Sequence, residues 1–235
     1  GLAVLALCVV WWLSTPVALP VTALVGLALL PLLGVLEPTA AFSLFGNQAV
    51  FFVVGVFLLA SAMLRSGLSR RAALWGLRRM AGSEDSLAAS VLGLSCLLCG
   101  VVVSHAVAAL MLPIVLGLIQ AMDLGPRSRL ARRLLLSMAW GTILGSNLTL
   151  FASARASLAL STYAAWATES SAPEGAAIGF LEFSSATALV VLLLLPVAFL
   201  WLRLVFPPQG RSLAPAVARL EEQAGTLGPL SRPEL

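Results

Sequence analysis

Residues 86–122 form a long stretch without a single Asp, Glu, Lys or Arg, and clusters of arginine flank it on both sides. The first cluster comprises Arg65, Arg70, Arg71, Arg78 and Arg79, and the second comprises Arg127, Arg129, Arg132 and Arg133. Arginine-rich loops stay on the cytoplasmic side of a membrane. The stretch must therefore leave that side and return to it, but two full crossings need about 40 residues plus a turn. We predict a re-entrant helical hairpin over 86–122, with its tip between Gly100 and His105.

The composition agrees with a membrane protein. Of the 235 residues, 60% are hydrophobic and only 10% are charged, whereas a soluble domain carries about 25% charged residues. This excludes an ordinary cytosolic enzyme, a disordered tail and a nucleic-acid-binding module. We expect an all-α, polytopic transmembrane protein, multi-pass in the cell (inner or plasma) membrane, with the lipid bilayer as partner and no nucleic acid. The sequence contains no HExxH motif and no paired intramembrane carboxylates, so we expect neither an enzyme nor an organic cofactor.

A second irregular segment is predicted after the hairpin. The apolar stretch that follows Arg133 is too long for one crossing, and Gly145, Ser146, Asn147 and Thr149 interrupt it at its centre. It reaches an acidic loop at 169–174 and returns through 178–202. We therefore predict a discontinuous helix over 130–167. The chain then divides into N-terminal scaffold and oligomerisation spans (1–85), a transport unit (86–167), an outer loop and last span (168–206), and a polar linker or tail (207–235).

Irregular backbone at membrane depth is tolerated only where it is buried in protein or lines a cavity. In secondary transporters, such broken helices direct their positive N-terminal ends at an anion, and their unwound carbonyls coordinate a cation. Four side chains near the two predicted irregular segments offer small oxygen ligands for Na⁺ or hydrogen bonds for an oxyanion: Ser104, Asn147, Thr149 and Ser153. The alternative for the hydroxyls is a bond to a carbonyl of their own helix.

Two further side chains are candidates for binding the transported solute. His105 is the single histidine, and it would contact the substrate or carry a coupled proton, because imidazole titrates near neutral pH. Arg155 lies inside an apolar stretch, where an arginine costs about 2.5–3.5 kcal/mol. It should face a polar cavity and hold an anion through two hydrogen bonds. The alternatives are helix packing for His105, and snorkelling or a pair with Glu182 for Arg155.

Several segments resemble the divalent anion:sodium symporter family of the wider ion-transporter superfamily, in the family's order over nearly 1–205. They are Trp11–Leu24, Leu32–Val35, Phe52–Leu68, Ser104–Pro113 and Gly145–Ser153. The resemblance implies the first of two inverted repeats of a secondary active transporter with elevator-type alternating access. The substrate would be a small inorganic or carboxylate anion of dicarboxylate, sulfate or phosphate type. A second transporter half would lie on the same or a separate chain, and the assembly would be a homodimer.

The family's motifs are kept in part. Its hairpin tip carries Ser-Asn-Thr, where this chain has Ser104, His105 and Ala106. In the break, Thr149 and Ser153 match the family pattern, but Ala152 replaces a glycine and the Pro-Pro-Asn that follows is absent. The resemblance implies Na⁺ coupling, with Ser104, Asn147 and Thr149 as Na⁺ ligands. The departures leave room for proton coupling through His105 or for a different anion at Arg155.

Two alternatives follow from these departures. One is a proton-coupled permease of arsenite or citrate type with the same architecture. The other is a membrane subunit that keeps the fold without transporting anything.

Overall fold

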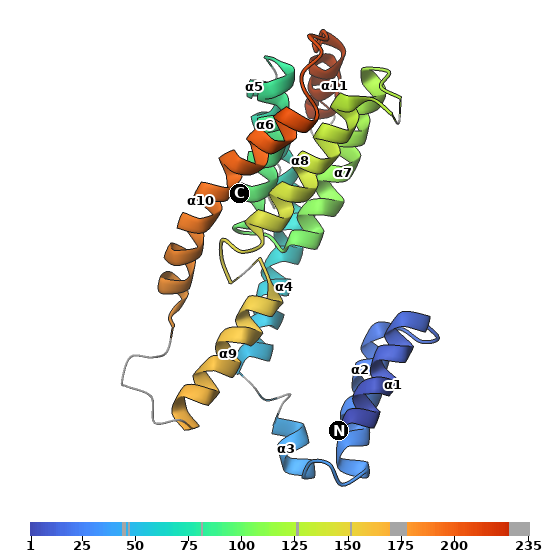
Figure 1. The fold of residues 1–235 in the computed structure, drawn as a ribbon, viewed down its shortest axis with the longest axis vertical. Coiled ribbons are helices and arrows are strands. Elements are labelled where there is room, and N and C mark those ends of the chain that lie inside the picture. The colour runs from blue at the N-terminus through green and yellow to red at the C-terminus, as the bar shows by residue number, and fades with distance from the viewer. Residues whose placement is uncertain are drawn as a thin grey trace. The chain divides into compact units, whose positions relative to one another are not determined.

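The computed structural model describes residues 1–43, 46, 48–80, 82–125, 127–150, 152–169 and 178–225. Every regular element in these ranges is an α-helix (Figure 1), which confirms the predicted all-α class. Contacts between residues divide the chain into two compact units, Gly1–Phe51 and Phe52–Leu235. The functional division at 85, 167 and 206 stays a prediction.

The first unit contains helices α1 (Leu2–Ser14), α2 (Leu19–Leu32) and α3 (Pro38–Ser43). Helix α1 ends at Thr15, which adopts a left-handed conformation with φ 46°, and the chain then reverses into α2. Gly26 of α2 faces the Cys8 side chain of α1 so closely that a Cβ there would overlap with the sulfur. A larger residue at this position would require the Cys8 side chain to move.

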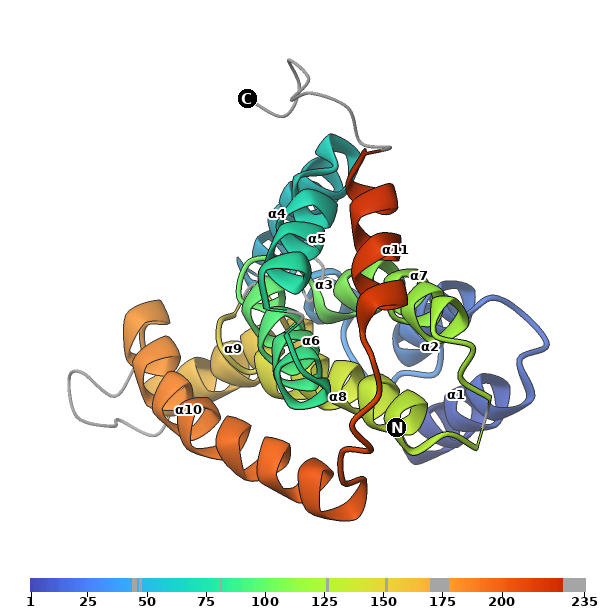
Figure 2. The same cartoon turned by 90° about the horizontal axis from the view of Figure 1, so that it is seen from above.

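Helix α4 (Gln48–Ser66) leads into the second unit. In the described residues after it, the helices are α5 (Leu68–Met80), α6 (Glu84–Cys99), α7 (Ser104–Ala121), α8 (Arg129–Gly145), α9 (Ala154–Glu169), α10 (Phe180–Val205) and α11 (Ala214–Gly225). Figure 2 shows α5 and α11 near one another at the end where α6 begins. Helices α7 and α10 have the length and hydropathy of membrane-crossing helices.

The core of this unit joins helices that are far apart in sequence. Leu74 of α5, Leu118 of α7 and Leu220 of α11 are at most 1% exposed and belong to one apolar cluster. Helix α10 packs on α6 and α8, and the indole rings of Trp140 and Trp201 stack with centroids 5.1 Å apart. Part of the segment predicted as a polar linker or tail is thus an amphipathic helix in the core, while residues 226–235 lie outside the described ranges.

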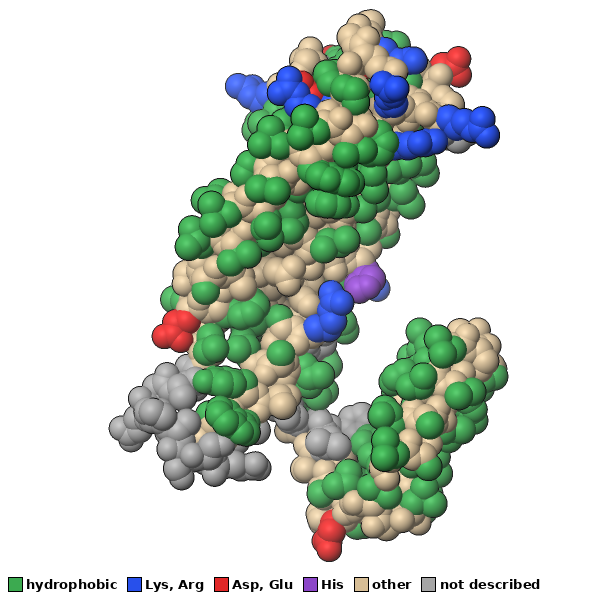
Figure 3. Space-filling view, viewed as in Figure 1, with side chains coloured by type: hydrophobic (Ala, Val, Ile, Leu, Met, Phe, Trp, Pro, Cys, Tyr) green, Lys and Arg blue, Asp and Glu red, His purple; other side chains and the backbone are tan. Residues whose placement is uncertain are grey.

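The first arginine cluster is helical rather than a loop. Ala73, Leu74 and Leu77 place three buried side chains on one face of α5, and their burial in the core stabilises a helix there. Three arginines of α5, Arg70, Arg78 and Arg79, are exposed. Figure 3 shows a group of arginine side chains at the end of the second unit that carries α5 and α11.

The two predicted irregular segments occur at the expected positions in the chain. Helix α6 ends at Cys99, and α7 begins at Ser104 and returns alongside it. Helix α8 ends at Gly145, and α9 begins at Ala154. Whether the α6–α7 hairpin re-enters the bilayer stays a prediction. The acidic loop is described only as far as 169, so Glu174 lies outside the described residues.

Candidate functional site

The turn of the hairpin is tight and has no side-chain cap at its second helix. The N–H of Gly100 donates to the Leu97 carbonyl at 3.0 Å, and that of Val102 donates to the Leu98 carbonyl at 2.9 Å. Val103 is extended, with φ −56° and ψ 134°, and its apolar side chain caps nothing. Helix α7 therefore begins at Ser104 with the N–H groups of its first turn directed at the turn region.

The break after α8 is built in a similar way. The N–H groups of Asn147 and Leu148 donate to the carbonyls of Leu144 and Gly145 at 3.1 and 3.0 Å, which tightens the last turn of α8. The chain then runs irregularly to Ala154, where α9 begins. Among the described residues, Ser146, Asn147 and Thr149 supply the polar side chains between Gly145 and Ala152.

Hydrogen bonds join the hairpin turn to the break. The Thr149 hydroxyl donates to the Gly100 carbonyl at 2.8 Å, and the Ser104 N–H donates to the Ala152 carbonyl at 3.4 Å. Helices α6 and α8 approach closely next to this junction. A Cβ on Gly145 would overlap with the backbone of Cys96. The two irregular segments therefore form one structural site.

A pocket of about 250 Å³ opens beside this junction. Its lining comes from three helices: Ser104, His105 and Ala108 of α7, Thr142 and Ile143 of α8 with Ser146 after it, and Arg155 of α9. The structure thus brings together three of the six predicted site residues, Ser104, His105 and Arg155.

The other three predicted residues do not line the pocket. Asn147 is exposed, and its amide N–H donates to the Ile143 carbonyl at 3.0 Å. The Thr149 hydroxyl donates to the Gly100 carbonyl in the hairpin turn. Ser153 is buried next to the start of α9. In this structure Thr149 connects the two segments.

Sequence reasoning did not assign two of the polar lining residues, Thr142 and Ser146. Both hydroxyls donate to carbonyls of α8, those of Ala139 and Ile143, at 2.8 and 2.7 Å. Their oxygens still have lone pairs to accept a further hydrogen bond. Their spacing of four places them on one helical face next to the break, and this spacing was the signal available in the sequence.

The pocket is electropositive. Ser104 and His105 lie in the first turn of α7, and Arg155 is the second residue of α9, so both helices begin at the pocket. A helix N-terminus acts as roughly half a positive charge, and the guanidinium of Arg155 adds a full one. None of the residues that line the pocket is acidic. Such a site suits an anion, which can accept hydrogen bonds from the guanidinium of Arg155.

The oxygen atoms at the junction are neutral. Within the described ranges, no group of three or more His, Cys, Asp or Glu residues could hold a metal ion. The Thr149 hydroxyl and the Gly100 carbonyl nevertheless place two neutral oxygens next to each other. Hydroxyl and carbonyl oxygens are the kind of ligand that Na⁺ accepts.

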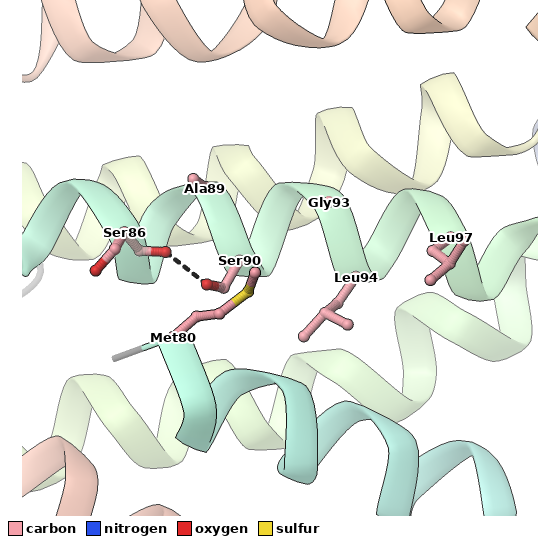
Figure 4. Close-up of a pocket in the computed structure, with 7 residues that line it drawn as sticks. All are labelled: Met80, Ser86, Ala89, Ser90, Gly93, Leu94 and Leu97. Atoms are coloured by element: carbon pink, nitrogen blue, oxygen red, sulfur yellow. Dashed lines mark hydrogen bonds between the residues drawn. The ribbon is translucent and has the colours of Figure 1, made fainter. Parts of the chain in front are cut away.

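A larger cavity, of about 430 Å³, lies elsewhere in the unit, between the end of α5 and the side of α6 (Figure 4). Met80 comes from α5, and Ser86, Ala89, Ser90, Gly93, Leu94 and Leu97 come from α6. The Ser90 hydroxyl donates to the Ser86 carbonyl at 2.6 Å. Because this bond uses its hydrogen, the lining of the cavity is mostly apolar. This cavity has no charged lining residue, so it does not suit an anion.

Helices α7 and α10 have the length and hydropathy to cross a membrane, and the pocket beside the junction carries a positive charge without an acidic lining residue. A sequence model of the family described as Citrate transporter (CitMHS) matches residues 9–223. The chain therefore belongs to this citrate transporter family and is a membrane protein. This membership agrees with the resemblance found in the sequence, since both point to the same superfamily of anion permeases.

Two relatives show what proteins similar to this chain do. Dicarboxylate transporter 1, chloroplastic, from Arabidopsis thaliana is 28% identical over 240 residues, covering 100% of this chain and 42% of the relative. The sodium-dependent dicarboxylate transporter SdcS of Staphylococcus aureus (strain USA300) is 31% identical over 110 residues, covering 47% of this chain and 21% of the relative. The chain thus spans less than half the length of these relatives.

Proposed function

We propose that this chain forms half of a secondary active transporter for anions and that transport is coupled to a cation. The observation that carries the proposal is the pocket of Ser104, His105, Thr142, Ser146 and Arg155, where two helices begin and no acidic side chain lies. By resemblance to the symporter family, the second half would lie on the same or a separate chain. Transport would follow an elevator-type alternating access in a homodimer.

The substrate class follows from the charge of the pocket and from the relatives. Arg155 can hold a carboxylate or another oxyanion through two parallel hydrogen bonds, and the N-terminus of α7 adds the positive end of its helix dipole. Both relatives carry dicarboxylate in their names. A dicarboxylate is therefore our first substrate class for this chain, ahead of citrate, sulfate and phosphate.

We assign the coupling ion to the junction rather than to the pocket. Ser104, Asn147 and Thr149 would be the Na⁺ ligands, together with the carbonyl of Gly100 that Thr149 already contacts. The sodium dependence in the name of SdcS supports this ion. Because the same segments shape the pocket, Na⁺ binding at the junction would order the anion site, which is how binding of one ligand raises the affinity for another.

Uptake into proteoliposomes tests the proposal. The protein, together with its second half, would be reconstituted, and uptake of labelled succinate and citrate would be measured with Na⁺ or choline outside. We expect concentrative succinate uptake that depends on Na⁺. Uptake that persists in choline and follows an imposed proton gradient would replace Na⁺ with H⁺ as the coupling ion. No uptake of either anion by a stably assembled protein would favour the non-transporting subunit.

The position of His105 favours one alternative, a proton-coupled permease of citrate or arsenite type. His105 is exposed and lines the pocket beside Arg155, so a proton on its imidazole would sit next to the anion. The variant His105→Asn restores the family's residue at this position. If the proton is the coupling ion, this variant loses the pH dependence of uptake. If Na⁺ is the coupling ion, the variant keeps its Na⁺ dependence.

A further inference from the structure

A third cavity in the second unit is lined by an arginine and, along one side, by apolar residues that form its floor. It has a volume of about 660 Å³. Gly67 and Arg70 come from the start of α5, and Gln223 comes from α11. The floor is one face of α7, formed by Ala106, Ala109, Leu110, Pro113 and Ile114. This cavity is separate from the anion pocket, because the two share no lining residue.

Helix α5 has the features of a helix that lies in a membrane interface. Its exposed side carries the arginines together with large apolar side chains, since Trp75 is 63% exposed and Met80 is 55% exposed. The guanidinium of Arg79 lies over the Trp75 ring at 6.0 Å. No acidic residue occurs between Arg65 and Ser83. Arginine and tryptophan on one exposed face are typical of helices that contact lipid headgroups.

We propose that the cavity between α5, α7 and α11 binds one anionic phospholipid. The guanidinium of Arg70 would bind the phosphate, and an acyl chain would lie along the apolar face of α7. Charge complementarity favours this occupant, because the arginine cluster attracts an anionic headgroup and an arginine pairs well with a phosphate. A soluble anion would leave the apolar floor in contact with water. The proposal does not rest on the transport activity.

Native mass spectrometry of the purified protein in detergent tests this site. Phosphatidylglycerol or phosphatidylcholine would be titrated in, and the bound lipid would be counted. We expect one phosphatidylglycerol to bind more tightly than phosphatidylcholine. An arginine near an anionic headgroup contributes about 1 kcal/mol, so Arg70→Gln should weaken phosphatidylglycerol binding by about fivefold or more. Equal binding of the two lipids, or an unchanged affinity in Arg70→Gln, would overturn the proposal.

Two further variants separate the site from general charge effects. Arg129→Gln removes the same charge from an exposed position in the second arginine cluster, outside the cavity, and should bind phosphatidylglycerol as the wild type does. Ala109→Leu fills the apolar floor without a change of charge and should weaken lipid binding. If glycerol phosphate or inorganic phosphate competes fully at matched concentration, the site recognises a free anion and the lipid assignment fails. A thermal melt of each variant checks that it is folded.

Discussion

Arg155 is the second residue of α9 and lines the pocket beside the junction, away from the two arginine clusters. An arginine inside an apolar segment costs free energy, and a bound anion offsets part of that cost. His105 faces the same pocket from α7. At the scale of single residues, we propose that these two side chains, with the hydroxyls of Ser104, Thr142 and Ser146, set which solutes the pocket accepts.

The variant Arg155→Gln should lower the affinity for the transported anion. Hydrogen bonds to charged groups contribute about 1.5–3 kcal/mol, so the KM for succinate should rise by about tenfold or more. The measurement is the concentration dependence of uptake in proteoliposomes. Arg132→Gln removes an equal charge from an exposed position in the second cluster and serves as control. An unchanged KM in Arg155→Gln would remove this residue from the binding site.

At the scale of secondary-structure elements, the packing of α8 against α6 depends on two glycines of α8. A Cβ on Gly141 would overlap with the Leu92 carbonyl, and a Cβ on Gly145 would lie 2.8 Å from the Cys99 Cβ. The small residues let α6 and α8 approach as closely as membrane helices with small side chains at their interface do. This close contact holds the hairpin turn against the break.

The variant Gly145→Ala should destabilise the protein although alanine favours helices. Overpacking costs about 1–3 kcal/mol, because backbone atoms of Cys96 cannot move aside. The matched control is Gly93→Ala on α6, where an added Cβ meets nothing within 4 Å and helix propensity gains up to about 1 kcal/mol. Thermal unfolding in detergent should show a lower Tm for Gly145→Ala and an equal or higher Tm for Gly93→Ala. The reverse order would refute the close packing.

The segment after α10 is held by one carboxylate. Glu84, at the start of α6, accepts hydrogen bonds from the N–H groups of Gln209 and Arg211 at 2.9 and 2.6 Å and is 5% exposed. These bonds direct α11 back onto α5 and α7. We expect Glu84→Gln to weaken this attachment, because an amide cannot offer two carboxylate oxygens to the two donors.

Hydrogen exchange measures the attachment of α11. In Glu84→Gln, amides of 209–225 should exchange faster, with the local opening free energy lowered by about 1–3 kcal/mol. Glu222→Gln removes an exposed i,i+3 pair with Arg219 and should change exchange little, since exposed pairs contribute about 0–1 kcal/mol. Exchange in Glu84→Gln that matches the wild type would show that apolar contacts alone hold α11.

At the scale of the second unit, one ion-pair network joins three helices at the arginine-rich end. Arg133 of α8 is 1% exposed and lies 2.6 Å from Asp85 of α6. Arg203 of α10 lies 3.1 Å from the other oxygen of Asp85. The guanidinium of Arg133 also lies over the Phe199 ring at 5.5 Å. The network therefore fixes the end of α10 to α6 and α8.

The variant Asp85→Asn should destabilise the unit more than a surface change does. It leaves the buried Arg133 charge without its carboxylate, which costs about 3–5 kcal/mol for a fully buried pair. Because Asp85 is 26% exposed, we expect about 2–3 kcal/mol. The measurement is denaturant-induced unfolding in detergent, with Glu221→Gln on the exposed side of α11 as control. A loss similar to that of the control would show that water screens the pair.

The sequence by itself determined the protein class, the all-α fold, and where the hairpin turn and the break occur along the chain. Charges are expensive in a bilayer, so arginine clusters and uncharged stretches indicate topology without any knowledge of contacts. Small and polar residues interrupt apolar helices at positions that can be counted from the sequence. These signals are local, and they also singled out Ser104, His105 and Arg155, which line one pocket in the structure; their role in binding stays a prediction.

Only the tertiary structure decided which side chains meet. The bond from Thr149 to Gly100 joins residues 49 apart in sequence, and the bond from Gln209 to Glu84 spans 125 residues. The inclusion of Thr142 and Ser146 in the pocket, the exclusion of Asn147, and the return of α11 to the core depend on such contacts. Helix packing sets them through the shapes of facing surfaces, and helical periodicity along one segment does not specify which surface of another segment it will face.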